Sequence, residues 1–235
     1  DLPLYYNMCE ILEHNLKARA NKIALYSNDG SLTFGEVSRQ VNQIGNALLR
    51  SGAQFGDCVA ILCPDRPEWV SSFFAVAKIG GIALAMNTLL KPEEYDYILG
   101  DSRARVLMVH ESLLDVIAPT FKNHKSLEHI VVIGDKRDTN YPTFDDWIVG
   151  EADALDAERT HRDDFCSLNY SSGTTGMPKG ILHAHKDYPL IAQLSGVDLF
   201  GLTEDDRTFS VAKLFFVYGI GANLIFPWYV GASCV

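Results

Sequence analysis

The residues best suited to chemistry form one run near the C-terminal end of the chain, YSSGTTGMPKG, between Tyr170 and Gly180. It combines four Ser and Thr hydroxyls, three glycines and the amino group of Lys179. Glycine turns where a Cβ would clash, and successive backbone N–H groups in such a turn form a concavity that binds anions. The hydroxyls add hydrogen-bond donors, and the lysine adds a mobile positive charge. Together these groups provide what a bound triphosphate needs.

The run differs from the two best-known nucleotide motifs. The Walker motif requires G-x-x-x-x-G-K-[ST], but here Lys179 follows Pro178, and Gly180 stands where Ser or Thr is required. The dinucleotide fingerprint G-x-G-x-x-G is also missing. The run instead resembles the phosphate loop of the adenylate-forming superfamily (acyl-CoA synthetases and AMP-dependent ligases), [ST]SG[ST]TGxPKG, at every fixed position. The constrained positions of this ten-residue motif favour it over a Ser- and Gly-rich surface loop.

The resemblance implies an enzyme that joins a carboxylic acid to coenzyme A in two steps. The carboxylate attacks the α-phosphorus of ATP to give an acyl-adenylate and pyrophosphate, and the coenzyme A thiol then displaces AMP. Mg²⁺ is expected to bridge the phosphates. The residues that the resemblance assigns to the ATP phosphates are Thr174, Thr175, Gly176 and Lys179, with Ser171, Ser172 and Gly173 shaping the loop.

Other segments resemble the benzoate-CoA ligases in particular. They are NTLL from Asn87, YDYILGDSRAR from Tyr95 and AKLFFVYGIG from Ala212. Most of the superfamily carries histidine where this chain has Phe216, and the benzoate-type enzymes carry phenylalanine there. A planar acid gains about 0.5–1.5 kcal/mol from each contact with an aromatic side chain. The residues predicted to line the acid pocket are Phe216, Val217, Tyr218, Gly219 and Ile220.

Several alternatives remain beside activation of a benzoate-like acid. Plain helix core is the alternative for the aromatic residues of this segment, and it is the one favoured for Phe215. The acid could be a hydroxy- or aminobenzoate, a cyclohexanecarboxylate or a fatty acid. The protein could also be a non-catalytic nucleotide-binding homologue. A serine hydrolase is disfavoured, because neither Ser171 nor Ser172 sits in a G-x-S-x-G elbow.

Composition limits the compartment and the partners. The chain has 235 residues, 47% hydrophobic and 21% charged, as is ordinary for a globular protein, and its net charge of −10 disfavours nucleic acid. Its five cysteines are odd in number and include no C-x-x-C pair, which predicts reduced thiols and a cytoplasmic location. His183 and His185 would share a strand face but lack a third ligand, so no metal site is predicted. The oligomeric state, monomer or homodimer, is left open.

One segment is long and apolar enough to be mistaken for a membrane span. Residues 214–235 contain no charged side chain, a length that could cross a bilayer. Glycines and Pro227 divide the segment into short pieces. A buried helix, a turn and a strand are therefore expected, with no membrane span.

The elements around these motifs alternate along the chain. A capping box of Thr33 and Glu36 begins a helix that ends near Gly52, and further helices are expected over 67–78, 92–99 and 144–149. Strands are expected over 22–26, 59–63, 82–86, 105–110, 129–133 and 165–170. Apolar strands that alternate with helices predict an α/β fold, with parallel-rich sheets covered by helices on both faces.

The domain organisation follows from the same alternation and from the resemblance. We expect a first α/β subdomain over residues 1–164, and a second, incomplete one that begins with the phosphate-loop strand and covers 165–235. The chain ends within an apolar run, which predicts the N-terminal part of the large domain of a longer adenylate-forming enzyme. The C-terminal lid domain and the family's catalytic lysine would lie beyond Val235. We therefore assign no catalytic residue here and expect this chain alone to be inactive.

Overall fold

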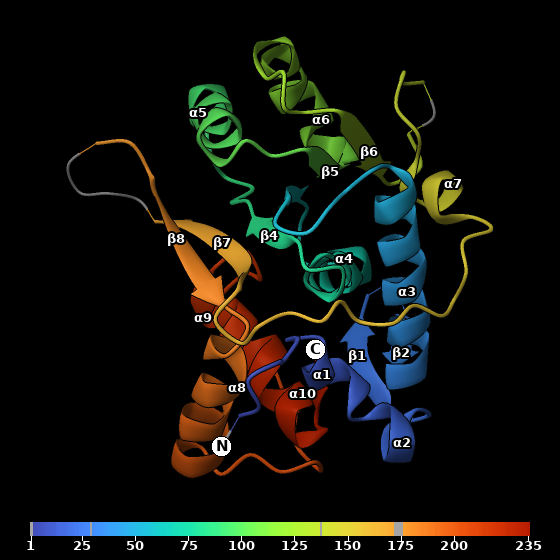
Figure 1. Cartoon of the computed structure of the whole chain (residues 1–235), viewed down its shortest axis with the longest axis vertical. Helices are drawn as coiled ribbons and strands as arrows, with labels where there is room; N and C mark the ends of the chain where they lie inside the picture. Colours follow the sequence, from blue (N-terminus) through green and yellow to red (C-terminus); the bar gives the residue numbers. More distant parts are fainter. Residues whose placement is uncertain (1, 29, 137, 172–175) are drawn as a thin grey trace.

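The computed structural model describes residues 2–28, 30–136, 138–171 and 176–235, and a six-stranded sheet of order β6-β5-β3-β4-β7-β8 forms its centre (Figure 1). The strands are β3 (Cys58–Leu62), β4 (Ile82–Ala85), β5 (Val106–His110), β6 (His129–Ile133), β7 (Phe165–Ser171) and β8 (Lys179–Ala184). The first five strands are parallel, and β8 is antiparallel to β7. The α/β prediction is therefore confirmed.

Helices cover both faces of this sheet. Val59 and Ile61 of β3 face the core beneath α3 (Phe34–Arg50) and α4 (Pro67–Lys78). Their neighbours in β3 face a second core, which is closed by α5 (Pro92–Ser102), α6 (Glu111–Ile117) and the 3-10 helix η1 (Ala118–Asn123). Figure 1 shows α3 and α4 on one side of the sheet and α5 and α6 on the other. Strands buried on both faces explain the continuous apolar runs in the sequence.

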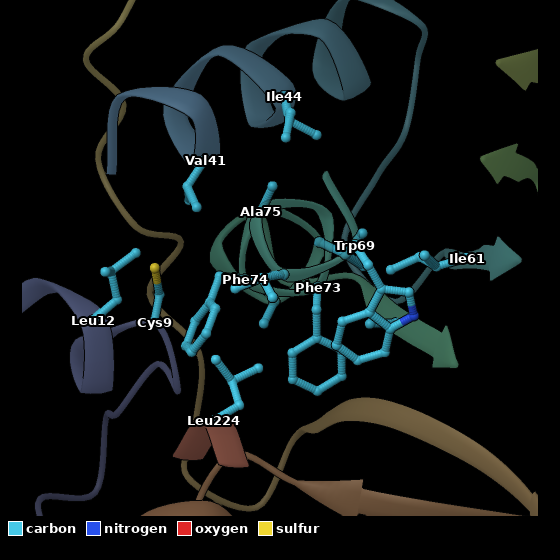
Figure 2. Packing of buried hydrophobic residues seen from close by; sticks show 14 of the residues in the cluster. Cys9, Leu12, Val41, Ile44, Ile61, Trp69, Phe73, Phe74, Ala75 and Leu224 are labelled. Carbon is cyan, nitrogen blue, oxygen red and sulfur yellow. The ribbon is translucent and has the colours of Figure 1, made fainter. Parts of the chain in front are cut away.

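Helix α4 is buried from Trp69 to its last residue, Lys78. Trp69 stacks on Phe73 with ring centroids 5.2 Å apart, and Phe74 stacks on Trp228 of α10 (Phe226–Val230) at 5.2 Å. Figure 2 shows Trp69, Phe73 and Phe74 on the α4 ribbon, with Phe74 between α3 and Leu224 of the C-terminal segment. A helix that is apolar all round is typical of such a sandwiched position.

A second, smaller sheet has the order β2-β1-β10-β9. Its strands are β1 (Ile23–Ser27), β2 (Gly30–Thr33), β9 (Arg207–Thr208) and β10 (Ser233–Cys234). β1 runs parallel to β10, with Leu25 opposite Cys234, so the beginning and the end of the chain share a sheet. Hydrophobic alternation predicts a strand but does not name its partner. The predicted division of the chain into two subdomains, between residues 164 and 165, stays a prediction.

Shorter helices complete the described structure. They are α1 (Glu10–Glu13), α2 (Leu16–Arg19), α7 (Phe144–Ile148), α8 (Asp187–Ile191), α9 (Val217–Ile220) and the π-helices η2 (Ala192–Leu199) and η3 (Gly221–Ile225). The uncharged segment 214–235 forms α9, η3, α10, a turn at Gly231 and β10, as predicted. No helix in the described part of the chain combines the length and the apolar character needed to cross a bilayer.

All five cysteines are described, and each is a buried free thiol. Burial raises the pKa of the Cys58 and Cys234 thiols to about 12, so both stay protonated near neutral pH. They pack as small apolar side chains. The cytoplasmic location stays a prediction.

The capping box that begins α3 is present and supports our first prediction. The Glu36 N–H donates to Thr33 Oγ1 (3.2 Å), and the Thr33 N–H donates to Glu36 Oε2 (2.8 Å). Thr33→Ala should lower the free energy of unfolding by about 1 kcal/mol, measured as a lower urea midpoint. An unchanged midpoint would contradict the cap's role.

The same cap should depend on pH. The hydrogen bond from the Thr33 backbone, followed by that from its side chain, lowers the pKa of Glu36 below 4.5. A lowered carboxyl pKa adds stability above the unfolded value, and this stability is lost as the pH falls through the folded value. Glu36→Gln should therefore cost stability near neutral pH and progressively less below about pH 4.

Candidate active site

The described ends of the predicted phosphate loop lie at the carboxyl end of β7, beside the carboxyl end of β4. Ala85 of β4 is opposite Asn169 of β7, and Ser171 is the last residue of β7. In parallel α/β sheets, ligands bind outside the carboxyl ends of the strands. Ser172, Gly173, Thr174 and Thr175, which are predicted phosphate-binding residues, lie outside the described residues.

The loop is closed by a β-hairpin that the sequence analysis did not predict. Ser171 is paired with Lys179, the first residue of β8, and Lys179 is exposed to solvent. Gly176 has φ +154°, and a Cβ there would meet nothing within 4 Å. The structure thus brings together three of the predicted residues, Ser171, Gly176 and Lys179, on one exposed hairpin. Strand β8 has no alternation of apolar and polar residues, because its neighbouring apolar residues Ile181 and Leu182 are both exposed. The sequence therefore did not indicate this strand.

Tyr170 connects this hairpin to α5, and the sequence analysis gave it no role. Its hydroxyl donates to Asp101 Oδ2 over 2.6 Å. Burial, and secondly the hydrogen bond to the Asp101 carboxylate, raise the pKa of the Tyr170 phenol. A Cβ on Gly180 would lie 3.4 Å from Cζ of the Tyr170 ring and 3.1 Å from Leu168, so the ring lies against this exposed glycine. The sequence feature that could have indicated this role is the position of Tyr170, an aromatic residue directly before the loop.

The two histidines after the loop do not form a metal site with their neighbours. His185 is fully buried, its Nδ1 accepts a hydrogen bond from the Met8 N–H (2.9 Å), and burial lowers its pKa to about 4. His183 Nδ1 lies 3.8 Å from Asp187 Oδ2. Within the described ranges, no three His, Cys, Asp or Glu side chains are grouped as metal ligands would be.

The predicted acid-pocket segment divides into an exposed and a buried part. Phe216 is 48% exposed and Tyr218 is 70% exposed, and Val217 between them is also exposed. Gly219 and Ile220 are buried. The preceding Phe215 is only 5% exposed and belongs to the core, as the sequence analysis favoured. Its ring centroid lies 4.5 Å from that of Phe216, so the exposed ring rests on a buried one.

A cavity of about 290 Å³ lies between the loop and the acid-pocket segment. Its lining includes Ala85 and Asn87 beside β4, Tyr170, Ser171 and Pro178 from the hairpin, and Phe216. The volume is near the lower limit of about 300 Å³ for small-molecule pockets. A larger hollow of about 900 Å³, lined by Arg162, Lys186 and Tyr229 among others, contains none of the predicted site residues that the structure describes. We favour the smaller cavity because Ser171 of the predicted phosphate loop and Phe216 of the predicted acid pocket both line it.

Two known ligases match the chain along its sequence. A benzoate–CoA ligase from Thauera aromatica is 38% identical over 237 residues, covering 100% of this chain and 44% of that protein. A 4-hydroxybenzoate–CoA/benzoate–CoA ligase from Rhodopseudomonas palustris is 32% identical over 234 residues, covering 98% of this chain and 43% of that protein. The chain therefore spans about half the length of these curated relatives.

Solved structures agree with these relatives. The anthranilate CoA ligase AuaEII in complex with anthranoyl-AMP has a TM-score of 0.99 and 60% identity, over 100% of this chain and 45% of that one. A benzoate CoA ligase from Burkholderia xenovorans LB400 has a TM-score of 0.88 and 30% identity, over 97% of this chain and 45% of that one. The family model for AMP-binding enzymes matches residues 12–235. The chain therefore belongs to the AMP-binding enzymes, the adenylate-forming superfamily that its phosphate loop resembles.

Proposed function

We propose that the protein, at the full length of its relatives, uses ATP to activate a benzoate-like aromatic acid and transfers the acyl group to coenzyme A. One observation carries this proposal. The 290 Å³ cavity is lined both by Ser171, a residue of the predicted phosphate loop, and by the aromatic ring of Phe216. The named activities of the relatives support an aromatic acid, since benzoate, hydroxybenzoate and anthranilate ligases are all among them.

The chain's own residues would act by positioning and by neutralising charge. A carboxylate is already ionised at neutral pH, so its attack on the α-phosphorus needs no general base. Lys179, exposed at the start of β8, would offset the charge on the β- and γ-phosphates. Ser171 would shape the near end of the loop, and Phe216 would face the acid ring. These roles bring a negatively charged nucleophile and a negatively charged electrophile into one place.

Magnesium enters this scheme with ATP, as part of the substrate. It would bridge phosphate oxygens and reduce the repulsion that the attacking carboxylate meets. The exposed hydroxyl of Ser171 is of the oxygen type that Mg²⁺ accepts. No resident metal is assigned to the described residues, and coenzyme A would be the third substrate, which reacts in the second step.

A 2-aminobenzoate is a second candidate for the acid. The structural neighbour with 60% identity over the whole chain is named for anthranilate. A benzoate and a 2-aminobenzoate have the same ring and carboxylate, so the cavity beside Phe216 suits both. They differ in one amino group, and substrate competition would separate them.

The decisive experiment is a panel of acids tested with the full-length protein, ATP, Mg²⁺ and coenzyme A. Benzoate, 2-aminobenzoate, 4-hydroxybenzoate, cyclohexanecarboxylate, acetate and a fatty acid would be compared by kcat/KM for pyrophosphate release. We expect the aromatic acids to be preferred. ATP binding without pyrophosphate release for any acid would instead identify a non-catalytic nucleotide-binding homologue.

A third prediction concerns the aromatic wall of the cavity. Phe216→His should lower kcat/KM for benzoate relative to acetate by about tenfold, because it replaces an apolar ring contact with a polar imidazole. Phe209→His is the matched control, since Phe209 is exposed and does not line this cavity. An unchanged preference in Phe216→His would remove this residue from the acid pocket.

A further inference from the structure

The segment that leads into the acid pocket is an irregular turn. Residues 209–216 join β9 to α9 without regular secondary structure. The turn is folded back on itself, because the Phe216 N–H donates to the Lys213 carbonyl over 3.0 Å. Such a turn needs outside contacts to hold one conformation, since each ordered residue costs about 1–2 kcal/mol of backbone entropy.

Two side chains from distant parts of the sequence supply those contacts. Asp65, in the loop after β3, accepts a hydrogen bond at Oδ1 from the Leu214 N–H over 2.9 Å. Its Oδ2 lies 3.6 Å from Lys213 Nζ. Asn169, in β7, donates from Nδ2 to the Phe215 carbonyl over 3.3 Å. Three consecutive residues of the turn are thus held by groups near the carboxyl ends of two strands of the large sheet.

Asn169 stabilises the folded state less than an apolar residue would at the same position. It is only 4% exposed, and its Oδ1 has no hydrogen-bond partner in the described part of the chain. A buried acceptor without a partner costs about 1–3 kcal/mol, and an apolar residue of the same size would avoid that cost. The side-chain amide of Asn169 instead fixes the orientation of the Phe215 carbonyl, to which it donates a hydrogen bond.

The position of Asn169 relates the two halves of the predicted site. It stands two residues before Ser171 on the same strand, and it is opposite Ala85, which lines the cavity. The strand that leads into the phosphate loop therefore also holds the turn before Phe216. Under the proposed function, the distance between bound phosphate and bound acid would depend on this connection.

We propose that Asp65 and Asn169 are positioning residues, which fix residues 213–215 so that Phe216 lines the cavity next to the phosphate loop. This inference rests on the proposed function for its consequence, but its structural part can be measured separately. Misplacement of a substrate by about 1 Å can lower a rate by about 10²-fold. Loss of either residue should therefore weaken the use of the acid, and it should leave the use of ATP unchanged.

The first measurement is deuterium uptake of peptides covering residues 212–220. Asn169→Leu and Asp65→Ala should each increase uptake there by at least about tenfold in rate. Asn15→Leu is the matched control, because Asn15 is also a buried amide whose Nδ2 donates to backbone carbonyls and whose Oδ1 has no partner among the described residues. Uptake in 212–220 that stays at the wild-type rate in Asn169→Leu or Asp65→Ala would overturn the proposal.

The second measurement is steady-state kinetics of the full-length protein. Asn169→Leu and Asp65→Ala should raise KM for the acid about tenfold and leave KM for ATP unchanged. Asp65→Asn keeps an acceptor for the Leu214 N–H and should restore most of the acid KM. Equal increases in both KM values, or no increase for the acid, would overturn the proposal. If the wild type activates no acid, the proposed function fails, and deuterium uptake alone decides whether the two residues hold the turn.

Discussion

Lys179→Ala should lower the rate of acid-dependent pyrophosphate exchange by about 10²-fold, the effect typical of removing one group that stabilises transition-state charge. Lys179 begins β8 opposite Ser171 and is exposed, and the proposed function assigns its amino group to a bound polyphosphate. The chain carries a net charge of −10, so the site must supply its own positive charge. Exchange between labelled pyrophosphate and ATP would measure the adenylation step without coenzyme A.

Two control variants make this result specific. Lys125→Ala removes another exposed lysine, in the turn after η1, and Ser38→Ala changes a buried residue of α3. Both should keep the wild-type exchange rate. The rise in melting temperature on adding MgATP should shrink in Lys179→Ala alone, because a weaker ligand stabilises the folded state less. A wild-type exchange rate in Lys179→Ala would exclude this lysine from the mechanism.

Gly219→Ala should destabilise the protein by about 1–3 kcal/mol, the usual cost of an added methylene in a packed site. A Cβ at this position would lie 2.2 Å from the Lys213 carbonyl oxygen, which belongs to the backbone and cannot rotate away. The turn that Asp65 and Asn169 hold would have to move. The melting temperature should fall by about 2–4 °C for each kcal/mol lost.

Gly100→Ala is the matched control for that prediction. Gly100 also lies in a helix, α5, and a Cβ there would meet only the His124 ring, at 3.4 Å. Where space allows, replacing a helical glycine by alanine raises the free energy of unfolding by about 0.4–1 kcal/mol, because alanine reduces the conformational entropy of the unfolded chain. Opposite signs for the two glycines are expected. A Gly219→Ala protein as stable as wild type would show that the turn relaxes freely.

The large sheet could be predicted because its signals are local. Helix α4 has the predicted bounds, because Pro67 begins it and Gly80 has φ +75° just after it. β6 also has its predicted bounds, because it is a short apolar run. β3 lies one residue earlier than expected, which leaves Cys63 beyond the strand. The antiparallel strand β8 was not predicted, because its adjacent apolar residues are both exposed and do not alternate with polar ones.

The site was predictable only where residue type and spacing carry the chemistry. The phosphate loop is a compact motif, and its hydroxyls, glycines and lysine stand together in the sequence. Asp65 and Asn169 have no such signal, since they contact the turn from 149 and 46 positions away. Only the fold brings them to residues 213–215. The roles of the loop and pocket residues stay predictions that the variants above would test.

The pairing of β1 with β10 has a consequence for how the chain acquires its structure. Ser233 Oγ donates to the Ile23 carbonyl over 2.6 Å, across 210 positions of sequence. Strands β3 to β6 can assemble from near neighbours, whereas the small sheet must await the last residues of this chain. During synthesis the β1–β2 hairpin emerges early with one edge uncovered, and such an edge recruits other strands. We therefore expect nascent chains halted before Ser233 to depend on chaperones and to aggregate without them.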